Sequence, residues 1–468
     1  MIIGNLISGD NILQKVSVIG GGLAGCEAAW QLGQKGITVS LYEMRPFQMT
    51  DAHVTADLAE LVCSNSLGAR SVDRASGLLK EELRRLGSLL IHCADESALP
   101  AGHALAVDRK AFSKVVGEAL ASHPLIEIIR EEHQTIPESP VIIASGPLTS
   151  PALAESIQSI TQVAHLFFYD AIAPIVTRES INMEIAFRAS RYDFDNMVEG
   201  DYVNCPMTQE AYTAFVDTLA KAERIPLKAF DHVEDLGHVP QNSDYFEGCL
   251  PVEVIAARSF RALAFGPMRP VGLRDPHTGL RPYAVVQLRQ DNLAGDLYNM
   301  VGFQTNLKYS EQQRVFRMIP GLEQADFIRY GQMHRNTYIA SPKLLNETMQ
   351  FRTRKDLFFA GQITGVEGYV GNIASGWLAG INLARLLRGE ELLTLPSTTM
   401  LGALMYYISH AEVDGFQPMK TNFGLLPSLG VKTKLMKKAR YEAYAVRALT
   451  DLQAFMQVHN LTQRSDYN

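Results

Sequence analysis

Cysteine is scarce in this chain, and its spacing argues against several kinds of site. Five cysteines occur among 468 residues, and no two of them form a CxxC pair. Zinc and iron–sulfur centres usually need such closely spaced cysteines, so we expect no metal site. A few widely spaced thiols are also typical of a reducing compartment, which favours a cytoplasmic location.

Long hydrophobic runs are missing as well. No run approaches the roughly 20 apolar residues that a membrane-spanning helix needs, so no membrane association is expected. Residues 1–14 lack the basic and apolar regions of a secretory signal, and we expect them to form an extension before the first strand. The hydrophobic content of 47% and the charged content of 20% are ordinary for a globular enzyme of two or three domains.

The chain has no overall excess of positive charge. A net charge of −7 does not indicate nucleic-acid binding, but net charge is a poor guide where basic residues cluster. Such a cluster suits either a solvated helix face or contacts with phosphate groups. Residues 401–450 contain seven basic residues against three acidic ones, and the basic residues are Lys420, Lys432, Lys434, Lys437, Lys438, Arg440 and Arg447.

The most informative pattern that is present lies in residues 15–43. An apolar, β-branched run leads into a glycine-rich turn, an alanine-rich helical pattern follows, and a second strand pattern ends at Glu43. This order is that of a dinucleotide-binding unit, in which the turn holds the pyrophosphate and the acidic residue holds the ribose. The expected contacts are Gly20, Gly21, Gly22, Leu23, Ala24 and Gly25 with the pyrophosphate, and Glu43 with the ribose.

A second glycine-rich block covers residues 357–377. Its pattern predicts a buried strand, a glycine-punctuated loop and a helix from about Asn372. Two-lobed flavoproteins often return to the flavin with such a unit, so the block favours FAD over NAD as the bound nucleotide. Gly361 and Gln362 are therefore predicted to contact the cofactor.

Together the patterns predict an α/β fold. We expect a two-lobed Rossmann-type FAD-binding domain with an inserted smaller α/β domain and a helical C-terminal stretch. The expected boundaries are 1–14 for the N-terminal extension, 15–150 and 326–468 for the discontinuous FAD-binding domain, and 151–325 for the inserted domain on the substrate and RNA side.

Two of the cysteines lie in loop-like surroundings. Cys63 follows one predicted helical piece of residues 55–87 and precedes another, and a helix N-terminus favours a thiolate. Cys249 lies between Gly248 and Pro251, again in a loop pattern. Most free cysteines are buried and inert, so the residues alone leave a reactive role and a packing role open for both.

Longer motifs resemble one family, the FAD- and folate-dependent tRNA (uracil-5-)-methyltransferases, or TrmFO family, which is related to the GidA flavoproteins. The resemblance runs from about Lys15 to Pro427, and Lys420 departs from it, because we expect Asn there in the family. The resembling segments, in the family's order, are VIGGGLAGCEAAWQL, LVCSNSLGA, FEGCLPVEV, FGPMRPVGL, RPYAVVQLRQDN, LYNMVGFQTNL, YGQMHRNTYIASP and FFAGQITGVEGYVGNIASGWLAG.

The resemblance implies methylation of C5 of uridine 54 in the T-loop of tRNA. The carbon would come from 5,10-methylenetetrahydrofolate, and NADH or NADPH would reduce the FAD. Uracil C5 is a weak nucleophile until a thiolate adds to C6. By resemblance Cys249 is expected to be this nucleophile and Cys63 to lie by the flavin, where it assists methylene handling or proton removal, although the two roles stay open to exchange.

The implied partners are tRNA, folate and a nicotinamide nucleotide, and we expect a monomer. Base-modifying enzymes take the base out of its stack, so basic residues are expected to hold the RNA backbone. Besides the C-terminal cluster, the candidates are Arg258, Arg261, Arg269, Arg274, Arg281 and Arg289.

Other functions stay open at this point. The same chemistry on ribosomal RNA is one, and GidA-type modification of a wobble uridine is another, although that branch has a further C-terminal helical region. An NAD(P)H-dependent flavin oxidoreductase without an RNA substrate would leave the Cys63 and Cys249 loops unexplained. A scaffold that binds RNA and is stabilised by FAD would bind tRNA without methyl transfer.

Overall fold

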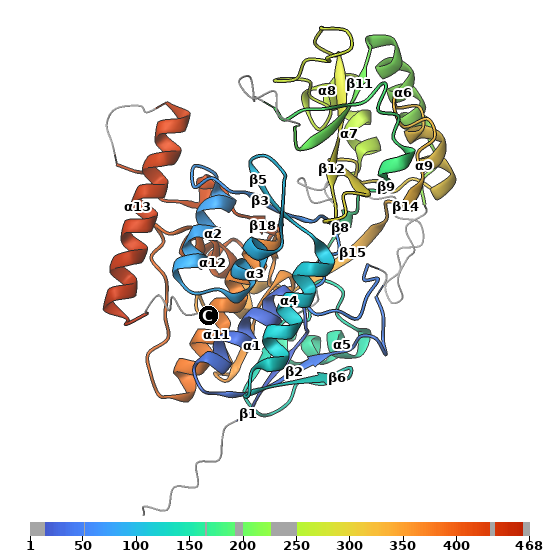
Figure 1. Cartoon of the computed structure of the whole chain (residues 1–468). Coiled ribbons are helices and arrows are strands. Elements are labelled where there is room, and N and C mark those ends of the chain that lie inside the picture. Colours follow the sequence, from blue (N-terminus) through green and yellow to red (C-terminus); the bar gives the residue numbers. More distant parts are fainter. Residues whose placement is uncertain are drawn as a thin grey trace, which may run out of the picture.

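Two hydrophobic cores divide the chain into a larger and a smaller lobe (Figure 1). The larger core draws on residues from Val16 to Met456, whereas the smaller one is built from residues between Val176 and Phe327. The computed structural model describes residues 15–50, 52–163, 166–191, 200–225, 250–430 and 436–461, without the side chains of 167–170 and 334–335.

A five-stranded sheet forms the centre of the larger lobe. Its order is β16-β7-β1-β2-β6, and all of its neighbouring strands are parallel. Val16, Val18 and Val39 are fully buried, as expected for a parallel sheet covered on both faces. The strands are β1 (Lys15–Ile19), β2 (Thr38–Glu43), β6 (Ile126–Arg130), β7 (Val141–Ile143) and β16 (Leu357–Phe359).

Helices from both halves of the chain cover this sheet. Helices α1 and α11 pack closely because small residues face each other. A Cβ at Gly376 of α11 would lie 2.2 Å from the carbonyl oxygen of Ala24 in α1. The helices of this lobe are α1 (Leu23–Gln34), α2 (Ala75–Arg85), α3 (Leu89–Glu96), α4 (Arg109–Ser122), α5 (Pro151–Thr161), α10 (Ser341–Leu344), α11 (Tyr369–Leu387), α12 (Met400–His410) and α13 (Lys437–Val458), with 3-10 turns η4 (Gln362–Thr364) and η5 (Phe423–Leu425).

Two short sheets complete the larger lobe. An antiparallel sheet has the order β3-β5-β4, and a parallel pair joins β17 to β18. Their bounds are β3 (Ser66–Ala69), β4 (Ala98–Leu99), β5 (Ala104–Val107), β17 (Val366–Glu367) and β18 (Met419–Lys420).

The smaller lobe contains a six-stranded antiparallel sheet of order β10-β11-β12-β13-β9-β14. An antiparallel ribbon of β8 (Leu166–Ala171) and β15 (Met333–Tyr338) lies between the lobes (Figure 1). The elements of the smaller lobe are β9 (Ile175–Thr177), β10 (Phe187–Arg188), β11 (Tyr202–Met207), β12 (Ala284–Gln290), β13 (Leu297–Met300), β14 (Phe327–Arg329), α6 (Gln209–Lys221), α7 (Val252–Arg258), α8 (Ala262–Phe265), α9 (Tyr309–Phe316) and η1 (Arg178–Ser180).

The structure confirms the predicted α/β fold with a parallel Rossmann-type sheet, and it corrects two details. Residues 55–87 contain one helix, α2, and not two, because residues 55–65 form turns and irregular chain and Ser66–Ala69 pairs with β5 as a strand. Helix α11 begins at Tyr369, earlier than Asn372. Residues 1–14 lie outside the described ranges. The predicted domain boundaries stay predictions, and α5, which starts at residue 151, packs into the larger core.

In the ranges that the structure describes, no helix is long and apolar enough to cross a lipid bilayer. The same ranges hold no group of three or more His, Cys, Asp or Glu side chains arranged to bind a metal ion.

One buried carboxyl links α2 to α12. Glu82 is fully buried, and its oxygens accept hydrogen bonds from the N–H groups of Met400 (2.7 Å) and Leu401 (2.9 Å) at the start of α12. Burial raises the pKa of Glu82 from 4.5 to about 7, although the two hydrogen bonds oppose the shift. The folded protein therefore binds this proton more tightly than the unfolded chain does. The resulting stabilisation is complete below about pH 4.5 and is lost as the pH rises to about 7.

We therefore expect the Glu82→Gln variant to become more stable relative to the wild type as the pH rises from about 5 to about 8. The relative change in unfolding free energy is at most about 3 kcal/mol, because each pKa unit corresponds to about 1.4 kcal/mol. Melting temperatures across this range measure it. Glu81→Gln, which removes a half-buried acid from the same helix, is the control. A pH-independent difference between Glu82→Gln and the wild type would contradict the expectation.

Candidate functional site

The glycine turn joins β1 to α1 at the carboxyl edge of the parallel sheet. Gly20 has a φ of +111°, and a Cβ there would lie 2.4 Å from the Ala144 carbonyl oxygen, so a side chain does not fit. A Cβ at Gly25 would lie 1.8 Å from the Gly20 carbonyl oxygen. Gly22 differs, because a Cβ there meets nothing within 4 Å. The turn therefore leaves open space beside Gly22 for a group that approaches the backbone.

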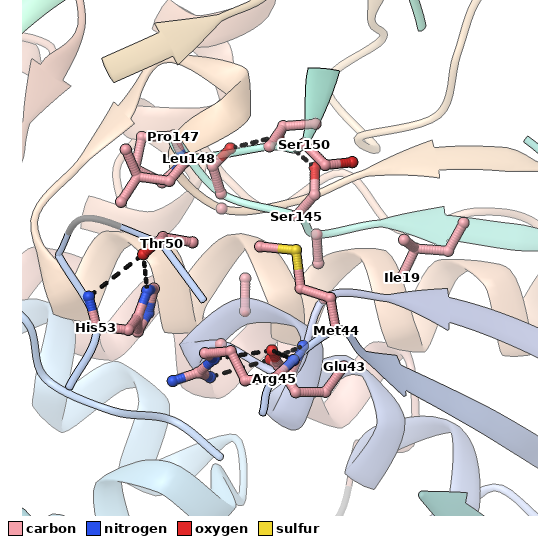
Figure 2. Close-up of a pocket in the computed structure, with 18 of the residues that line it drawn as sticks. Ile19, Glu43, Met44, Arg45, Thr50, His53, Ser145, Pro147, Leu148 and Ser150 are labelled. Atoms are coloured by element: carbon pink, nitrogen blue, oxygen red, sulfur yellow. Dashed lines mark hydrogen bonds and ion pairs between the residues drawn. The ribbon is translucent and has the colours of Figure 1, made fainter. Parts of the chain in front are cut away.

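A cleft opens over this turn (Figure 2). It holds about 1010 Å³ between protein atoms, part of it continuous with solvent. Helix α1 starts after Gly22, which has no side chain to cap the first turn, so N–H groups and the positive end of the helix dipole suit a phosphate. The predicted cofactor residues that line the cleft are Gly20, Gly21, Gly22, Leu23, Ala24, Glu43, Gly361 and Gln362, whereas Gly25 packs behind the turn.

Glu43 has four hydrogen-bond donors in this structure. Oε1 accepts from Nε (2.8 Å) and the backbone N–H (3.0 Å) of Arg45, and Oε2 accepts from Nη2 of Arg45 (3.0 Å) and from the Gly21 N–H (3.1 Å) (Figure 2). Burial raises the pKa of Glu43, but Arg45 outweighs it and lowers the pKa, so the carboxylate stays ionised. A carboxylate has about four acceptor positions. A ribose contact therefore requires one donor to give way, and this role of Glu43 stays a prediction.

A second cavity adjoins the cleft and holds about 1290 Å³ between protein atoms, likewise partly continuous with solvent. One wall residue is Asn372, whose buried Oδ1 has no hydrogen-bond partner among the described residues. A buried acceptor without a donor is unfavourable, so this atom marks a position for a donor on a ligand. The cleft and the cavity share Val62, Pro147, Leu148, Gln362, Tyr369 and Asn372.

Cys63 lines this second cavity and is half-buried. The hydroxyl oxygen of Tyr369 accepts hydrogen bonds from the N–H groups of Cys63 (2.8 Å) and Ser64 (3.0 Å). Burial raises the pKa of Tyr369, so its hydroxyl stays neutral. The cavity thus contains the Cys63 thiol, and the backbone of Cys63 is hydrogen-bonded to Tyr369 at the start of α11.

The other described cysteines differ from Cys63 in their surroundings. Cys26, Cys93 and Cys205 are buried, and burial raises the pKa of each thiol. Such thiols pack as small apolar groups. Cys249, with Lys432 and Lys434 of the basic cluster, lies outside the described residues.

An ion pair forms another part of the cavity wall. Glu367 is buried, and it accepts a hydrogen bond from Nε2 of Gln362 at 2.7 Å. Nζ of Lys420 lies 3.9 Å from the other oxygen of Glu367. Lys420 therefore places an ammonium group at the cavity, beside a carboxylate.

The comparisons with known proteins agree in one family. The family described as glucose inhibited division protein A matches residues 15–391. The methylenetetrahydrofolate–tRNA-(uracil-5-)-methyltransferase TrmFO of Bacillus pumilus is 55% identical over 440 residues, which cover 94% of this chain and 98% of that protein. The TrmFO of Enterococcus faecalis is 56% identical over 441 residues, with the same two shares. The chain belongs to the TrmFO family of GidA-related proteins.

The solved structures place this TrmFO family member on a known fold. The form II crystal structure of Aquifex aeolicus GidA superimposes with a TM-score of 0.67 at 15% identity, covering 97% of this chain and 75% of that one. The form I crystal gives a TM-score of 0.65 at 16% identity. At these identities the likeness shows the fold alone.

Sequence reasoning missed several side chains at the site of this family member. Tyr369 lies inside the second glycine-rich block, but no spacing pattern reveals that its hydroxyl holds Cys63. Arg289 was expected to contact RNA phosphates, but only 7% of it is exposed, and it donates hydrogen bonds to Ser64 and Asn65. The signal that could have directed attention to it is its place in a mainly apolar strand, β12, since buried arginines need specific partners.

We expect Gly22→Val to lose bound FAD. A Cβ at this position meets no protein atom within 4 Å and would point into the open space beside the first turn of α1, so the protein should still fold. Flavin absorbance per protein should fall at least tenfold, because a phosphate can no longer approach the backbone. The control is Gly117→Val, which also faces open space but lies on α4 and outside the cleft. Normal flavin content in folded Gly22→Val would contradict this position for the pyrophosphate.

Proposed function

We propose that this protein methylates C5 of a uridine in tRNA, with 5,10-methylenetetrahydrofolate as carbon donor and FAD, reduced by NADH or NADPH, as redox cofactor. Relatives whose names state this folate-dependent methylation are 55% and 56% identical over nearly the whole chain. The structural observation that carries the proposal is the cavity with Cys63, which shares a wall with the cleft over the glycine turn. Position 54 of the T-loop is the proposed target, and tRNA, folate and a nicotinamide nucleotide are the proposed partners of a cytoplasmic monomer.

The residues of the cleft fit FAD. Gly22 leaves room for the pyrophosphate beside the start of α1, and the residues after β7 and β16 close the cleft. The unpaired Oδ1 of Asn372 suits the imide N–H of a flavin ring where the cleft meets the cavity. When bound, FAD would supply the reducing equivalents that complete the methyl group.

The chain's own groups have separable tasks in this proposal. Tyr369 holds the two N–H groups at Cys63 and Ser64, which orients the thiol in the cavity. Addition of a thiolate at C6 of uracil makes C5 nucleophilic, and a base must then remove the proton from C5. We assign C6 addition to Cys249, and methylene handling or proton removal to Cys63. The test below also decides whether the roles are exchanged.

The proposed RNA surface includes α13, at one edge of the larger lobe (Figure 1). Tyr441 and Tyr444 stack on Phe423, with ring centroids 4.5 and 5.8 Å apart from it. The cations of Lys437 and Arg440 lie 5.7 and 5.5 Å from the Tyr441 ring. Cations interleaved with aromatic rings suit a nucleic-acid backbone and unstacked bases.

Incubation with unmodified tRNA, NADPH and 5,10-methylenetetrahydrofolate should give 5-methyluridine at position 54, and S-adenosylmethionine alone should give none. Cys63→Ala should abolish the product while NADPH still reduces the flavin. Cys93→Ala, which removes a buried thiol away from the cavity, should keep the activity. With tRNA that contains 5-fluorouridine, Cys249→Ala should lose the covalent complex and Cys63→Ala should retain part of it.

Three results would count against the assignments. The opposite pattern with 5-fluorouridine would exchange the two thiols. Product from S-adenosylmethionine alone would overturn the donor. Methylation of ribosomal RNA in place of tRNA would move the same chemistry to another substrate.

Replacing Lys437, Lys438 and Arg440 together by Gln should weaken tRNA binding and leave the flavin content unchanged. Each lost phosphate contact should reduce the slope of log K against log salt by about 0.7–0.9. The control replaces Lys110 and Lys114, two exposed cations of α4, by Gln. A dissociation constant and salt slope equal to those of the wild type would show that α13 is only a solvated face.

A further inference from the structure

The loop around Cys63 takes its hydrogen bonds from distant side chains and not from its own secondary structure. The carbonyl oxygens of Leu61 and Cys63 accept from Nη1 and Nη2 of Arg109, the latter at 3.3 Å. The carbonyl oxygen of Val62 accepts from Nη2 of Arg329 at 2.8 Å. The Tyr369 hydroxyl accepts from the N–H groups of Cys63 and Ser64. Five backbone polar groups of residues 61–64 are therefore held by side chains from outside this loop.

Arg289 contacts the loop through two side chains at once. Its Nε donates to Oδ1 of Asn65 at 2.9 Å, and its Nη2 donates to Oγ of Ser64 at 2.6 Å. Nδ2 of Asn65, which is fully buried, donates to the carbonyl oxygens of Gln290 (2.9 Å) and Val107 (3.2 Å). Arg289 and Gln290 belong to β12 of the smaller lobe, whereas the loop belongs to the larger one. These contacts therefore join the two lobes at the residues that follow Cys63.

The charges at this junction are mainly positive. Arg109 and Arg329 donate to backbone oxygens of residues 61–63, and Arg289 donates to the side chains of Ser64 and Asn65, so three guanidinium groups surround the loop that carries Cys63. The carboxylate of Asp291 forms an ion pair with Arg109, whose Nε lies 3.2 Å from Oδ2 of Asp291. An excess of positive charge favours an anionic sulfur.

The titration of these groups supports their charge states. Burial lowers the pKa of Arg289 and of Arg329, whereas for Arg109 the neighbouring Asp291 outweighs burial and raises the pKa. Guanidinium groups start from a pKa so high that they remain charged. The phenols next to the loop and Arg289, Tyr369 and Tyr202, stay neutral because burial raises their pKa values.

We propose that Arg289 is a positioning residue that holds the Cys63 loop from the smaller lobe, so that the reactivity of Cys63 depends on the docking of the two lobes. The inference rests on the proposed function, in which Cys63 works in the cavity. Removal of the guanidinium takes away one positive charge, removes the donor to Oδ1 of Asn65 and leaves Oγ of Ser64 with only the Ser66 N–H, at 3.1 Å. The planar guanidinium of Arg289 donates to Asn65 and Ser64 at the same time, a geometry that a lysine ammonium cannot reproduce.

The test is alkylation of Cys63 by iodoacetamide in the full-length, FAD-loaded protein, followed by peptide mass spectrometry from about pH 6 to about pH 9. The midpoint for Cys63 should move up by about one pH unit in Arg289→Gln, because a nearby cation favours the thiolate by about that much. Arg289→Lys keeps the charge without the fork and should show a smaller shift. The matched control is Arg188→Gln on β10 of the same sheet, whose Nη2 donates to the Tyr298 hydroxyl at 2.7 Å. It should leave the midpoint unchanged.

Kinetics of tRNA methylation separate positioning from RNA binding. In Arg289→Gln, kcat should fall about tenfold, as expected for one lost unit of thiolate stabilisation. The KM for tRNA should change less than about twofold, because the side chain is buried. A raised KM with an unchanged alkylation midpoint would make Arg289 an RNA contact and overturn the proposal.

Two further measurements keep the proposal testable. If Arg289→Gln does not fold, Ser64→Ala removes one of the two contacts and should still shift the midpoint upward. An unshifted midpoint in that variant and in Arg289→Lys would overturn the proposal. The alkylation profile needs no methyl transfer. Absence of 5-methyluridine from the wild type would therefore refute the proposed function and leave the positioning role to be judged by alkylation alone.

Discussion

The close packing of α1 against the sheet and against α11 is the constraint on which the site depends. Gly25 lets α1 approach the Gly20 carbonyl, and Gly376 lets α11 approach the backbone of α1 at Ala24. Any side chain at these glycines would push the helices apart. Because the helices meet so closely, the start of α1 lies at the cleft while Tyr369, at the start of α11, lines both the cleft and the cavity. A nucleotide site and a reactive thiol become neighbours as a result.

The Cys63 loop shows a second way to build a rigid site. It forms neither helix nor strand up to residue 65, and its polar groups are satisfied by Tyr369 and by arginines from both lobes. Burying arginines is unfavourable unless their donors are paired and their charge is used. Such an arrangement is expected where function, and not stability, decides the residues. It also makes the geometry at Cys63 a property of both lobes together.

Sequence patterns predicted the nucleotide-binding half well and the Cys63 loop poorly. The β1–turn–α1–β2 unit and the strand–loop–helix of residues 357–377 lie where they were expected, apart from a helix start at Tyr369. The two-helix prediction for residues 55–87 failed at the Cys63 loop. The hydrogen-bond partners of this loop are distant in the sequence, so no periodic pattern of residues distinguishes it from a helix. The domain boundaries and the roles of the site residues stay predictions, and Cys249 lies outside the described residues.

The sequence by itself determined the glycine turn and the family, because both depend on residues close together or on long motifs in order. The turn requires a φ of +111° at residue 20, which favours glycine, so the glycine in the sequence itself indicates the turn. Only the tertiary structure decided that Glu43 is already hydrogen-bonded to Arg45 and that Arg289 is buried and hydrogen-bonded to Ser64. Arg289 and Ser64 are 225 residues apart, and contacts across such separations are set by how the lobes dock, which no local pattern records.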